Sequence, residues 1–424
     1  MPETIFALSS GRPPAAIAVI RISGPRAREA ALALAGDLPE ARMAMVRTLR
    51  DPVSGEHLDE ALVLRFDTPA SATGEDLVEL HCHGGRAVVD AVLAALGRAE
   101  GLREARPGEF TRRALENGRI DLTEAEGLAD LLEAGTESQR RAALRMAEGG
   151  LRRLLEGWSE RVVMLSAEAE RAIDYAEEDD DVAETGIAAS AATLAGELGE
   201  WLERPRVEPL KEGVRVVAAG PPNAGKSSLI NAIAGIDRSI VSAIAGTTRD
   251  VVEIPLAIAG IPFVFADTAG LRDGADSIEV IGIERAAAEI ERADIILWLG
   301  EANQIPADRK AVLVHAKSDI AGVGPAGSVP VSALTGDGMA ELIATIVAMG
   351  RSLMPGEDVL ALNRRQAAAI SEARDALAEA VDQRDPAIQA ELLRAARVAF
   401  DRCTGRAGIE DVLDGLFARF CLGK

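Results

Sequence analysis

The eight residues from Gly220 to Ser227 constrain the fold more than any other part of the chain. They read Gly-Pro-Pro-Asn-Ala-Gly-Lys-Ser and match the pattern GxxxxGK[ST]. In this pattern backbone N–H groups cradle phosphates, Lys226 neutralises the β- and γ-phosphates, and the Ser227 hydroxyl is a Mg²⁺ ligand. A strand-like segment, Val214 to Ala219, which is apolar except for Arg215, precedes the loop, and an amphipathic segment, Ser228 to Ile233, follows it. This order predicts a strand, a phosphate-binding loop and a helix.

Short apolar runs recur beyond this loop. Phe263 to Ala266, Ile295 to Leu299 and Ala311 to His315 have the length and composition of buried strands, and helical segments separate them. Strands that alternate with helices predict a doubly wound, mostly parallel sheet. Ligands of such sheets bind beyond the carboxyl ends of the strands, so we look for the site just after each run.

Four short motifs follow in the order that GTPases require. Gly246-Thr-Thr-Arg-Asp250 offers a hydroxyl to Mg²⁺ and a switch that can sense the γ-phosphate. Asp267-Thr-Ala-Gly270 supplies a carboxylate for the ion and an amide for the γ-phosphate. In Lys317-Ser-Asp319 the aspartate can accept hydrogen bonds from guanine, and Ser332-Ala-Leu334 completes the base side. Each string is weak alone, but their order predicts a Ras-like P-loop GTPase domain and excludes most ATPases.

Two positions depart from familiar GTPase patterns. The guanine motif normally reads Asn-Lys-x-Asp, and Ala316 stands where the Asn is expected, so nucleotide binding is weaker or another group compensates. Ras-like enzymes place a Gln after Asp-x-x-Gly to orient water, and here that position is Leu271. Glu279, Glu284 and Arg272 can take over this role chemically, although on the residues alone a helix-surface role is the simpler interpretation for each.

The remaining chain shows two other kinds of sequence pattern. Its 424 residues exceed one ordinary domain, and a 48% hydrophobic content with 3% aromatic residues is typical of Ala- and Leu-rich helical packing. A residue pattern typical of long helices extends from about Asp121 to Glu203 and occurs again from Asn363 onward. Pro205 to Pro209 marks a linker after the first of these segments. We infer a helical domain made of two separated segments, with the GTPase domain inserted between them.

The first hundred residues predict an α+β domain. Ala15 to Ile22, Ala61 to Phe66 and Asp76 to Leu80 have strand patterns, and Ala87 to Ala99 carries apolar residues at helical spacing. The sequence His81-Cys82-His83 follows the third strand. It has no fourth ligand at standard metal-site spacing, so a strand-end turn is favoured over a metal site.

Charge and cysteine content limit the possible partners. The net charge is −22, with 68 Asp and Glu against 46 Lys and Arg. A broad nucleic-acid-binding face needs an excess of Lys and Arg over Asp and Glu. Any contact with RNA must therefore come from a local basic patch or from a partner protein. Three cysteines form no disulfide framework, and no apolar run spans a membrane. We expect a soluble cytoplasmic protein, and a solvated loop at the acidic run Glu177 to Asp181.

Motifs along essentially the whole chain match one family, and the terminal Cys-Leu-Gly-Lys is the most distinctive of them. The matching residues are Arg21-Ile-Ser-Gly24, Thr73-Gly-Glu-Asp76 with His83-Gly-Gly85, Arg106-Pro-Gly-Glu-Phe-Thr111, Ile120-Asp-Leu122 with Glu124-Ala-Glu126, Ile173-Asp-Tyr175 with Glu177-Glu-Asp179, Asp267 to Arg272, Ile281-Gly-Ile-Glu-Arg285 and Cys421 to Lys424. On these motifs the chain resembles the MnmE (TrmE) family of tRNA-modifying GTPases, which act on wobble uridine.

The resemblance implies four segments. Residues 1–117 would form an N-terminal α+β domain that binds tetrahydrofolate and dimerises. Residues 118–207 and 353–424 would be the two parts of the helical domain, and residues 208–352 the GTPase domain. The family is activated by GTPase-domain dimerisation with K⁺, which takes the place of an arginine finger.

The resemblance also implies individual roles in the GTPase domain. Glu279 falls on the family's catalytic glutamate, with Arg272 as a second catalytic candidate. Ser227 and Thr248 would bind Mg²⁺, and Asn223, Ser242, Ile244 and Thr247 would bind K⁺. The full set of expected GTP-binding residues is Asn223, Ala224, Gly225, Lys226, Ser227, Ser228, Ser242, Ala243, Ile244, Ala245, Gly246, Thr247, Thr248, Asp267, Thr268, Ala269, Gly270, Lys317, Asp319, Ser332, Ala333 and Leu334.

In the N-terminal domain the resemblance implies a site for a one-carbon tetrahydrofolate, either 5-formyl- or methylene-tetrahydrofolate. The matching residues are Arg21, Glu79, Arg119 and Lys424; Arg119 replaces a lysine of the family. A carboxylate suits the pterin amino edge, and cations suit the glutamate tail. Cys421 would lie near this site, as a modification-site nucleophile or as a supporting tail residue.

The family's activity gives the functional expectation. A homodimer would join an FAD-dependent partner, MnmG (GidA), in a heterotetramer that adds an aminomethyl or carboxymethylaminomethyl group to C5 of the wobble uridine of certain tRNAs. FAD and NADH would belong to the partner. One alternative is an Era-like ribosome-assembly GTPase, which predicts a basic RNA-binding appendix. Another is a folate enzyme with a vestigial GTPase domain, against which the complete phosphate loop argues.

Overall fold

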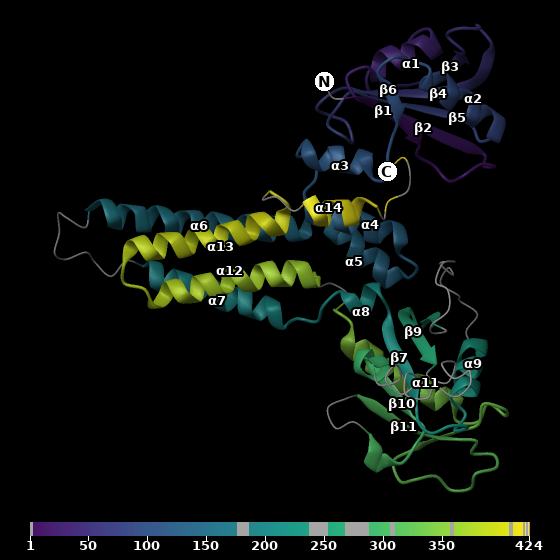
Figure 1. Ribbon diagram of the computed structural model, residues 1–424, viewed down its shortest axis with the longest axis vertical. Coiled ribbons are helices and arrows are strands. Elements are labelled where there is room, and N and C mark those ends of the chain that lie inside the picture. Colours follow the sequence, from purple (N-terminus) through teal and green to yellow (C-terminus); the bar gives the residue numbers. More distant parts are fainter. Residues whose placement is uncertain are drawn as a thin grey trace, which may run out of the picture. The chain divides into compact units, whose positions relative to one another are not determined.

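The structure is a computed structural model that describes residues 3–175, 186–236, 253–267, 288–305, 310–356, 360–406, 410–418, 420 and 423. Two compact units are present (Figure 1). One comprises Met1–Ala129, Met146–Glu160 and Arg397–Lys424, and the other Asp130–Arg145 and Arg161–Ala396. Within the described ranges, no helix is long and apolar enough to cross a membrane.

A mixed six-stranded sheet forms the N-terminal part of the first unit. Its strand order is β3-β4-β5-β2-β1-β6, and every pair is antiparallel except β1 with β6. The three strands and the helix expected from the sequence are present as β2, β4, β5 and α2. The elements are β1 (Thr4–Leu8), β2 (Ile17–Ser23), α1 (Ala27–Ala35), β3 (Ala44–Arg50), β4 (His57–Phe66), β5 (Leu77–His83), α2 (Arg86–Gly97), β6 (Leu102–Glu104) and α3 (Glu109–Glu116).

Helices α1 and α2 cover one face of this sheet. Alternate residues of β2 and β5, such as Ile20 and Leu80, pack against Leu34 of α1 and Leu96 of α2. The opposite face is covered at β1, where Ile5 and Ala7 pack with Phe110 of α3. Because strand residues alternate between faces, the neighbours of the core residues in β2 and β5 lie on the second, more open face.

The GTPase sheet has the order β12-β11-β10-β7-β9-β8 and is parallel except for β8. Val216 lies in the core with α9 and α11, whereas Val217 packs on the opposite face with Ala293. Burial on both faces explains why β7 is continuously apolar from Val216 to Ala219. The elements are β7 (Val214–Ala219), α9 (Lys226–Ile236), β8 (Glu253–Ile258), β9 (Ile261–Asp267), β10 (Ile295–Trp298), η2 (Ala302–Gln304), β11 (Ala311–Ala316), β12 (Val329–Val331) and α11 (Met339–Leu353).

Helices dominate the segments on both sides of the GTPase sheet in the sequence. Helices α7 and α12 pack along each other, and Asn363 and Gln366 form a capping box at the start of α12. In the first unit, Leu122 and Ala125 of α4 share a core with Leu416 of α14. The helices are α4 (Leu122–Glu133), α5 (Glu137–Ala147), α6 (Gly150–Tyr175), α7 (Ile187–Glu203), α8 (Glu208–Lys211), α12 (Arg364–Asp382), α13 (Pro386–Thr404) and α14 (Glu410–Phe417).

The expected fold class is therefore confirmed: an N-terminal α+β domain, helical segments and a mostly parallel Ras-like sheet occur in one chain. The expected acidic loop, Glu177 to Asp181, lies outside the described residues.

Candidate functional site

The phosphate loop joins the central strand β7 to helix α9. Gly220 has φ +146°, and a Cβ added there would stand 2.9 Å from the carbonyl carbon of Leu299. Glycine is therefore required both for the backbone conformation and for the close approach to the end of β10. The local sequence places the loop at the point where strands run to opposite sides of β7, which is where doubly wound sheets bind ligands.

Lys226 is folded into the loop that precedes it. Lys226 is only 7% exposed, and its Nζ donates hydrogen bonds to the carbonyl oxygens of Gly220 and Pro221 at 3.0 and 2.9 Å. Lys317 closes the loop from the base side, since its Nζ donates to the Asn223 carbonyl at 2.9 Å. Ser227 and the Asn223 side chain remain exposed. The loop thus combines a fixed cation with exposed hydroxyl and amide groups.

The other described GTPase motifs lie at the same edge of the sheet. Asp267 is the last residue of β9 and pairs with Ala218 in β7. Lys317 directly follows β11, and Ser332 follows β12. Parallel strands bring their carboxyl ends together, so these sequence-distant residues share one edge. The expected residues Ser242, Ala243, Ile244, Ala245, Gly246, Thr247, Thr248, Thr268, Ala269, Gly270, Arg272 and Glu279 lie outside the described residues.

A cavity of about 220 Å³ opens beside the loop on the base side. Ser332 is fully buried and its Oγ accepts from the backbone N of Thr335 at 3.2 Å, which holds the loop after β12. Ala316 also lines the cavity: its Cβ would be 3.6 Å from a Cβ added at Gly225. The lining residues are Gly225, Ser228, Leu229, Ala316, Lys317, Asp319, Ile320, Val331, Ser332, Ala333 and Leu334. They include seven of the expected GTP-binding residues.

A row of charged side chains crosses the open face of the N-terminal sheet. Arg21 of β2 lies opposite Glu79 of β5, and its Nη2 and Nε donate to Glu79 Oε1 at 2.7 and 3.1 Å. His81 Nε2 lies 3.2 Å from Glu79 Oε2. The guanidinium of Arg21 lies 5.7 Å from the centre of the Phe110 ring. The structure thus brings together two of the four residues expected to bind folate.

Sequence reasoning did not assign a role to His81. The prediction of a turn after the strand at His81-Cys82-His83 was wrong in detail, because β5 continues through these residues and ends at His83. Cys82 is 2% exposed and packs in the core, so it faces away from the two histidines. Burial raises the pKa of its thiol to about 12, helped by the charge of Asp59. The period-two alternation of the strand was the signal that could have placed His81 beside Glu79.

The carboxyl group of Glu79 is kept ionised by its neighbours. Burial raises its pKa, but the hydrogen bond and charge of Arg21, with smaller contributions from His81, outweigh burial and hold the pKa below its usual value. Each carboxylate oxygen has two lone pairs, so Glu79 can accept further hydrogen bonds while both contacts persist. An ionised acceptor on an open sheet face is suited to an amino group of a ligand.

The other expected folate-binding residues are placed differently. Arg119 lies against the turn at Gly74, where an added Cβ would be 3.2 Å from Arg119 Cγ. The carboxylate of Glu79 pairs with Arg21 rather than with Arg119. Lys424 and Cys421 lie outside the described residues. Gly423 is described: a Cβ there would be 2.2 Å from the Leu8 carbonyl oxygen, so the chain end approaches the end of β1.

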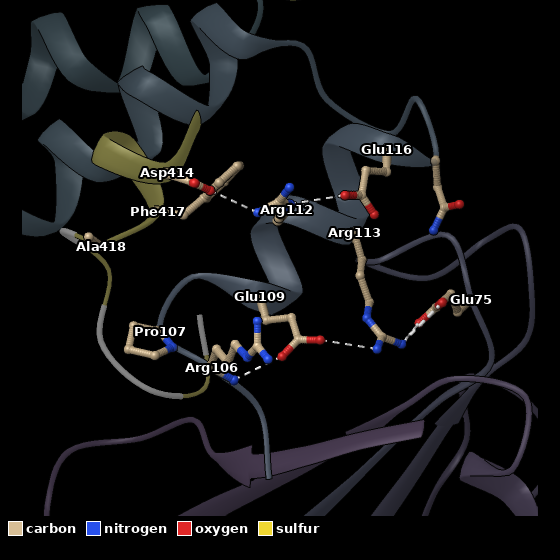
Figure 2. A pocket seen from close by; sticks show the side chains of 11 residues that line it. Glu75, Arg106, Pro107, Glu109, Arg112, Arg113, Glu116, Asp414, Phe417 and Ala418 are labelled. Carbon is tan, nitrogen blue, oxygen red and sulfur yellow. Dashed lines mark hydrogen bonds and ion pairs between the residues drawn. The ribbon is translucent and has the colours of Figure 1, made fainter. Parts of the chain in front are cut away.

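A second cavity in the same unit, of about 720 Å³, lies between α3 and α14 (Figure 2). Arg112 joins the two helices, with ion pairs of 3.0 Å to Glu116 and to Asp414. A Cβ added at Gly108, whose φ is +70°, would stand 2.6 Å from the Phe417 carbonyl oxygen. The glycine of the Arg-Pro-Gly-Glu-Phe motif therefore permits close packing of the C-terminal helix.

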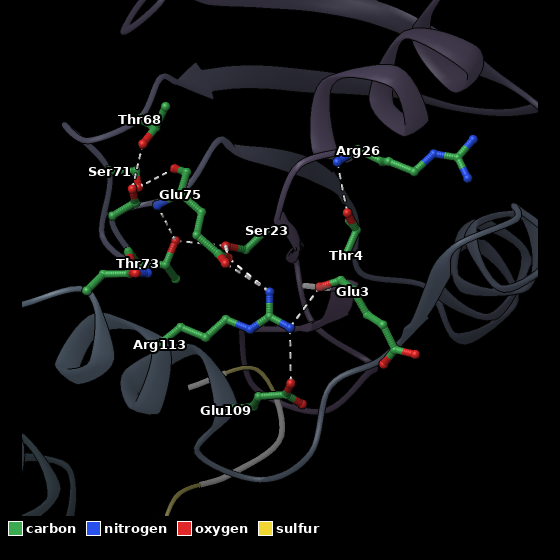
Figure 3. A network of polar contacts seen from close by, with 12 residues as sticks. Glu3, Thr4, Ser23, Arg26, Thr68, Ser71, Thr73, Glu75, Glu109 and Arg113 are labelled. Atoms are coloured by element: carbon green, nitrogen blue, oxygen red, sulfur yellow. Dashed lines mark hydrogen bonds and ion pairs between the residues drawn. The ribbon is translucent and has the colours of Figure 1, made fainter. Parts of the chain in front are cut away.

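In the wall of this cavity, Arg113 organises a largely buried polar network (Figure 3). Its guanidinium contacts Glu75 at 2.9 Å, the Glu3 carbonyl at 2.9 Å and Glu109 at 3.2 Å. Ser23 links Glu75 to Thr73, at 2.8 and 2.7 Å. Burial raises the pKa of Glu109, but hydrogen bonds from Arg103 and from the Arg106 amide dominate and lower it to about 2. This network connects α3 to the loop before β5.

Comparisons with known proteins cover nearly the entire chain. Residues 4–119 match the family model described as the N-terminus of the GTP-binding protein TrmE, and residues 122–421 match that of the MnmE helical domain. A tRNA modification GTPase MnmE of Erythrobacter litoralis is 55% identical over 100% of both chains. The same-named protein of Novosphingobium aromaticivorans is 53% identical, also over 100% of both.

Among solved structures, the G domain of the T. maritima FeoB iron transporter is similar over 32% of this chain and 98% of that chain, with 24% identity and a TM-score of 0.25. The full-length sequence relatives, rather than this partial likeness, decide the family. They favour tRNA modification over the Era-like alternative. The chain belongs to the MnmE family of tRNA modification GTPases.

Proposed function

We propose that the chain hydrolyses GTP at the carboxyl edge of the β7–β12 sheet. Hydrolysis would drive a conformational change during the modification of wobble uridine in tRNA. The observation that carries this proposal is the convergence of the phosphate loop, Asp267 and the Lys317–Asp319 turn at one edge. Family membership supplies the reaction context. Residues 1–117, 118–207 with 353–424, and 208–352 are the proposed domains.

The described residues are chemically suited to the ions that the family uses. Ser227, exposed at the first turn of α9, and Asp267, which ends the adjacent β9, would hold Mg²⁺ together with Thr248. When bound, Mg²⁺ neutralises charge that develops on the phosphates. Asn223 uses its backbone carbonyl to bind Lys317 and leaves its side-chain oxygen exposed, which suits a K⁺ ligand. Ser242, Ile244 and Thr247 would complete that site.

The protein's own groups then have distinct tasks during hydrolysis. Lys226, fixed by two carbonyls of its loop, binds phosphate oxygens. Asp319 lines the base cavity and accepts hydrogen bonds from guanine. Glu279 orients the attacking water, in place of the Gln that Leu271 replaces, and Arg272 assists. Dimerisation of GTPase domains would bring these groups into register.

The Arg21–Glu79 pair is the proposed centre of a tetrahydrofolate site. Glu79 would accept from the pterin amino edge, and Arg119 and Lys424 would bind the glutamate tail. The bound folate, as its 5-formyl or methylene form, supplies the one-carbon unit. The chain would act as a homodimer with an FAD-dependent MnmG (GidA) partner, which holds FAD and NADH, in a heterotetramer that adds an aminomethyl or carboxymethylaminomethyl group. Cys421 would stand near this centre.

Deletion of the gene, followed by mass-spectrometric profiling of tRNA nucleosides, tests the proposed function. We expect the aminomethyl-type wobble uridines to disappear and to return with the wild-type gene. A complementing gene with Lys226→Ala should fail to restore them. An unchanged nucleoside profile in the deletion strain would refute the function.

A further inference from the structure

A groove between helices α7 and α12 has an excess of positive charge in its lining. It has a volume of about 540 Å³. Three arginines line it against a single carboxylate, Glu203. A neighbouring cavity near β7 shares Arg206 and Arg364 with the groove; its lining holds four arginines and four carboxylates and has no charge excess. The excess of positive charge is therefore confined to the groove side, in a chain whose net charge is −22.

Helix periodicity builds this groove. Arg364, Ser371 and Arg374 recur at helical spacing on one face of α12, and Arg206 follows α7 on the facing side. The small residues Gly199, Ala367 and Ala368 also line the groove. Because these residues have little or no side chain, they leave room between helices that otherwise pack closely. A backbone-sized ligand can enter there.

The arginines of the groove are weakly neutralised by the protein. Arg206 Nη1 is buried and has no hydrogen-bond partner, and no acidic side chain of the described residues pairs with Arg206 or Arg364. Arg374 bonds to Ser371 Oγ at 3.2 Å and to the neighbouring Asp375, whose side chain is 63% exposed. Exposed ion pairs of that kind contribute little and exchange readily. Unpaired guanidinium donors fit phosphate oxygens well, often with two hydrogen bonds.

We propose that this arginine groove, formed by Arg206, Arg364 and Arg374, binds the phosphodiester backbone of tRNA. The inference rests on the proposed function and assigns to this chain the local basic patch that its acidic composition requires. Screening confines charge effects to about 8 Å at physiological salt, so a local cluster can attract RNA although the whole chain is acidic. The contacts would be independent of base sequence, since hydrogen bonds to phosphate oxygens carry no direct information about the bases.

A charge-matched pair of variants tests the groove in the full-length protein. The first carries Arg206→Gln, Arg364→Gln and Arg374→Gln. The control carries Arg98→Gln, Arg140→Gln and Arg394→Gln, which remove exposed arginines that pair with nearby carboxylates. Both lower the net charge by three, so a general electrostatic effect changes both equally. Circular dichroism and GTP hydrolysis, which should be unchanged, report that each variant is folded.

Binding to total tRNA is measured by filter retention between 50 and 200 mM KCl. Each phosphate contact contributes about 0.7–0.9 to the slope of log affinity against log salt, so the groove variant should lose about two to three from that slope. The ratio of wild-type to groove-variant tRNA affinity should therefore be about 20- to 40-fold smaller at 200 mM than at 50 mM KCl. The control should retain the wild-type slope.

Three outcomes would refute the proposal that the groove binds tRNA. The tRNA affinity could fall equally in both variants, it could fall in neither, or the wild-type chain could fail to bind tRNA. Inorganic phosphate, added at constant ionic strength, distinguishes a small-anion site: arginine-dependent phosphate binding with unaltered tRNA binding would refute RNA as the ligand. Nucleoside profiling separates the two proposals, because normal modification in the deletion strain refutes the function, whereas full restoration by the groove variant with unaltered tRNA binding refutes only the groove.

Discussion

Substituting Ala316 by Asn should tighten guanine-nucleotide binding. Ala316 ends β11, lines the base cavity, and lies 3.6 Å from the place that a Gly225 side chain would occupy. Asn extends from Cβ into this space and can bond the phosphate loop and the nucleotide. A net hydrogen bond contributes about 0.5–1.5 kcal/mol, which corresponds to about two- to tenfold in affinity.

The assay is a fluorescence titration with N-methylanthraniloyl-GDP, with Ala316→Leu as the control. Leu has the same number of side-chain heavy atoms as Asn and a similar shape, but it lacks the amide. We expect Asn to lower the dissociation constant and Leu to leave it unchanged or raise it. If Leu tightened binding as much as Asn did, packing rather than hydrogen bonding would explain the gain. If Asn had no effect, another group already compensates and the reasoning fails.

Four further predictions address the remaining sites. GTP hydrolysis should be faster in K⁺ than in Na⁺, and Asn223→Ala should abolish that difference while GDP still binds; equal wild-type rates would remove the proposed K⁺ site. Asp319→Asn should shift binding from guanine toward xanthine nucleotides, and an unchanged preference in competition titrations would contradict its base contact. Glu109→Gln should lower the free energy of unfolding in urea near neutral pH by about 3 kcal/mol at most, from a pKa lowered from 4.5 to about 2. Because the folded-state pKa of Glu109 is depressed, its contribution to stability is complete above pH 4.5 and is lost as the pH falls toward 2. A stability difference between wild type and the variant that stayed as large at pH 2 would contradict this electrostatic contribution. Cys82 should resist iodoacetamide at pH 8 in the folded protein, since its thiol has a pKa of about 12; rapid alkylation detected by mass spectrometry would contradict its burial.

The GTPase half of the fold could be predicted because its information is local. Strand β7, the loop at Gly220 and helix α9 are contiguous, and the motif itself requires that order. The sharing of one edge by Asp267 and Asp319 also follows from sequence, because alternating strands and helices give parallel strands with their carboxyl ends together. Strand β7 is Val214–Ala219 as expected, whereas β9 extends to Ile261–Asp267, and the edge strands β8 and β12 were not expected.

The N-terminal site required information that the sequence does not contain locally. Arg21 and Glu79 meet because β2 pairs with β5 in one register, and a slip by one residue would turn Glu79 to the core face. The same register places His81 on the second oxygen of Glu79, although its immediate neighbours suggested only a strand end. Motif resemblance could select Arg21 and Glu79, but pairing geometry was needed to show that they form one ionised acceptor.

The arginine groove illustrates a different limit. In the sequence, Arg206 stands near a proline-rich linker and Arg374 lies far along a helix beside an aspartate, so each resembles an ordinary surface charge. What distinguishes them is the absence of a large residue at Gly199 and Ala367, which opens the space between α7 and α12. Composition indicated that any RNA contact had to be local, but only the packing of two helices could show where local positive charge exceeds negative charge. The net charge and the groove are therefore compatible, since one describes the whole surface and the other a local region of it.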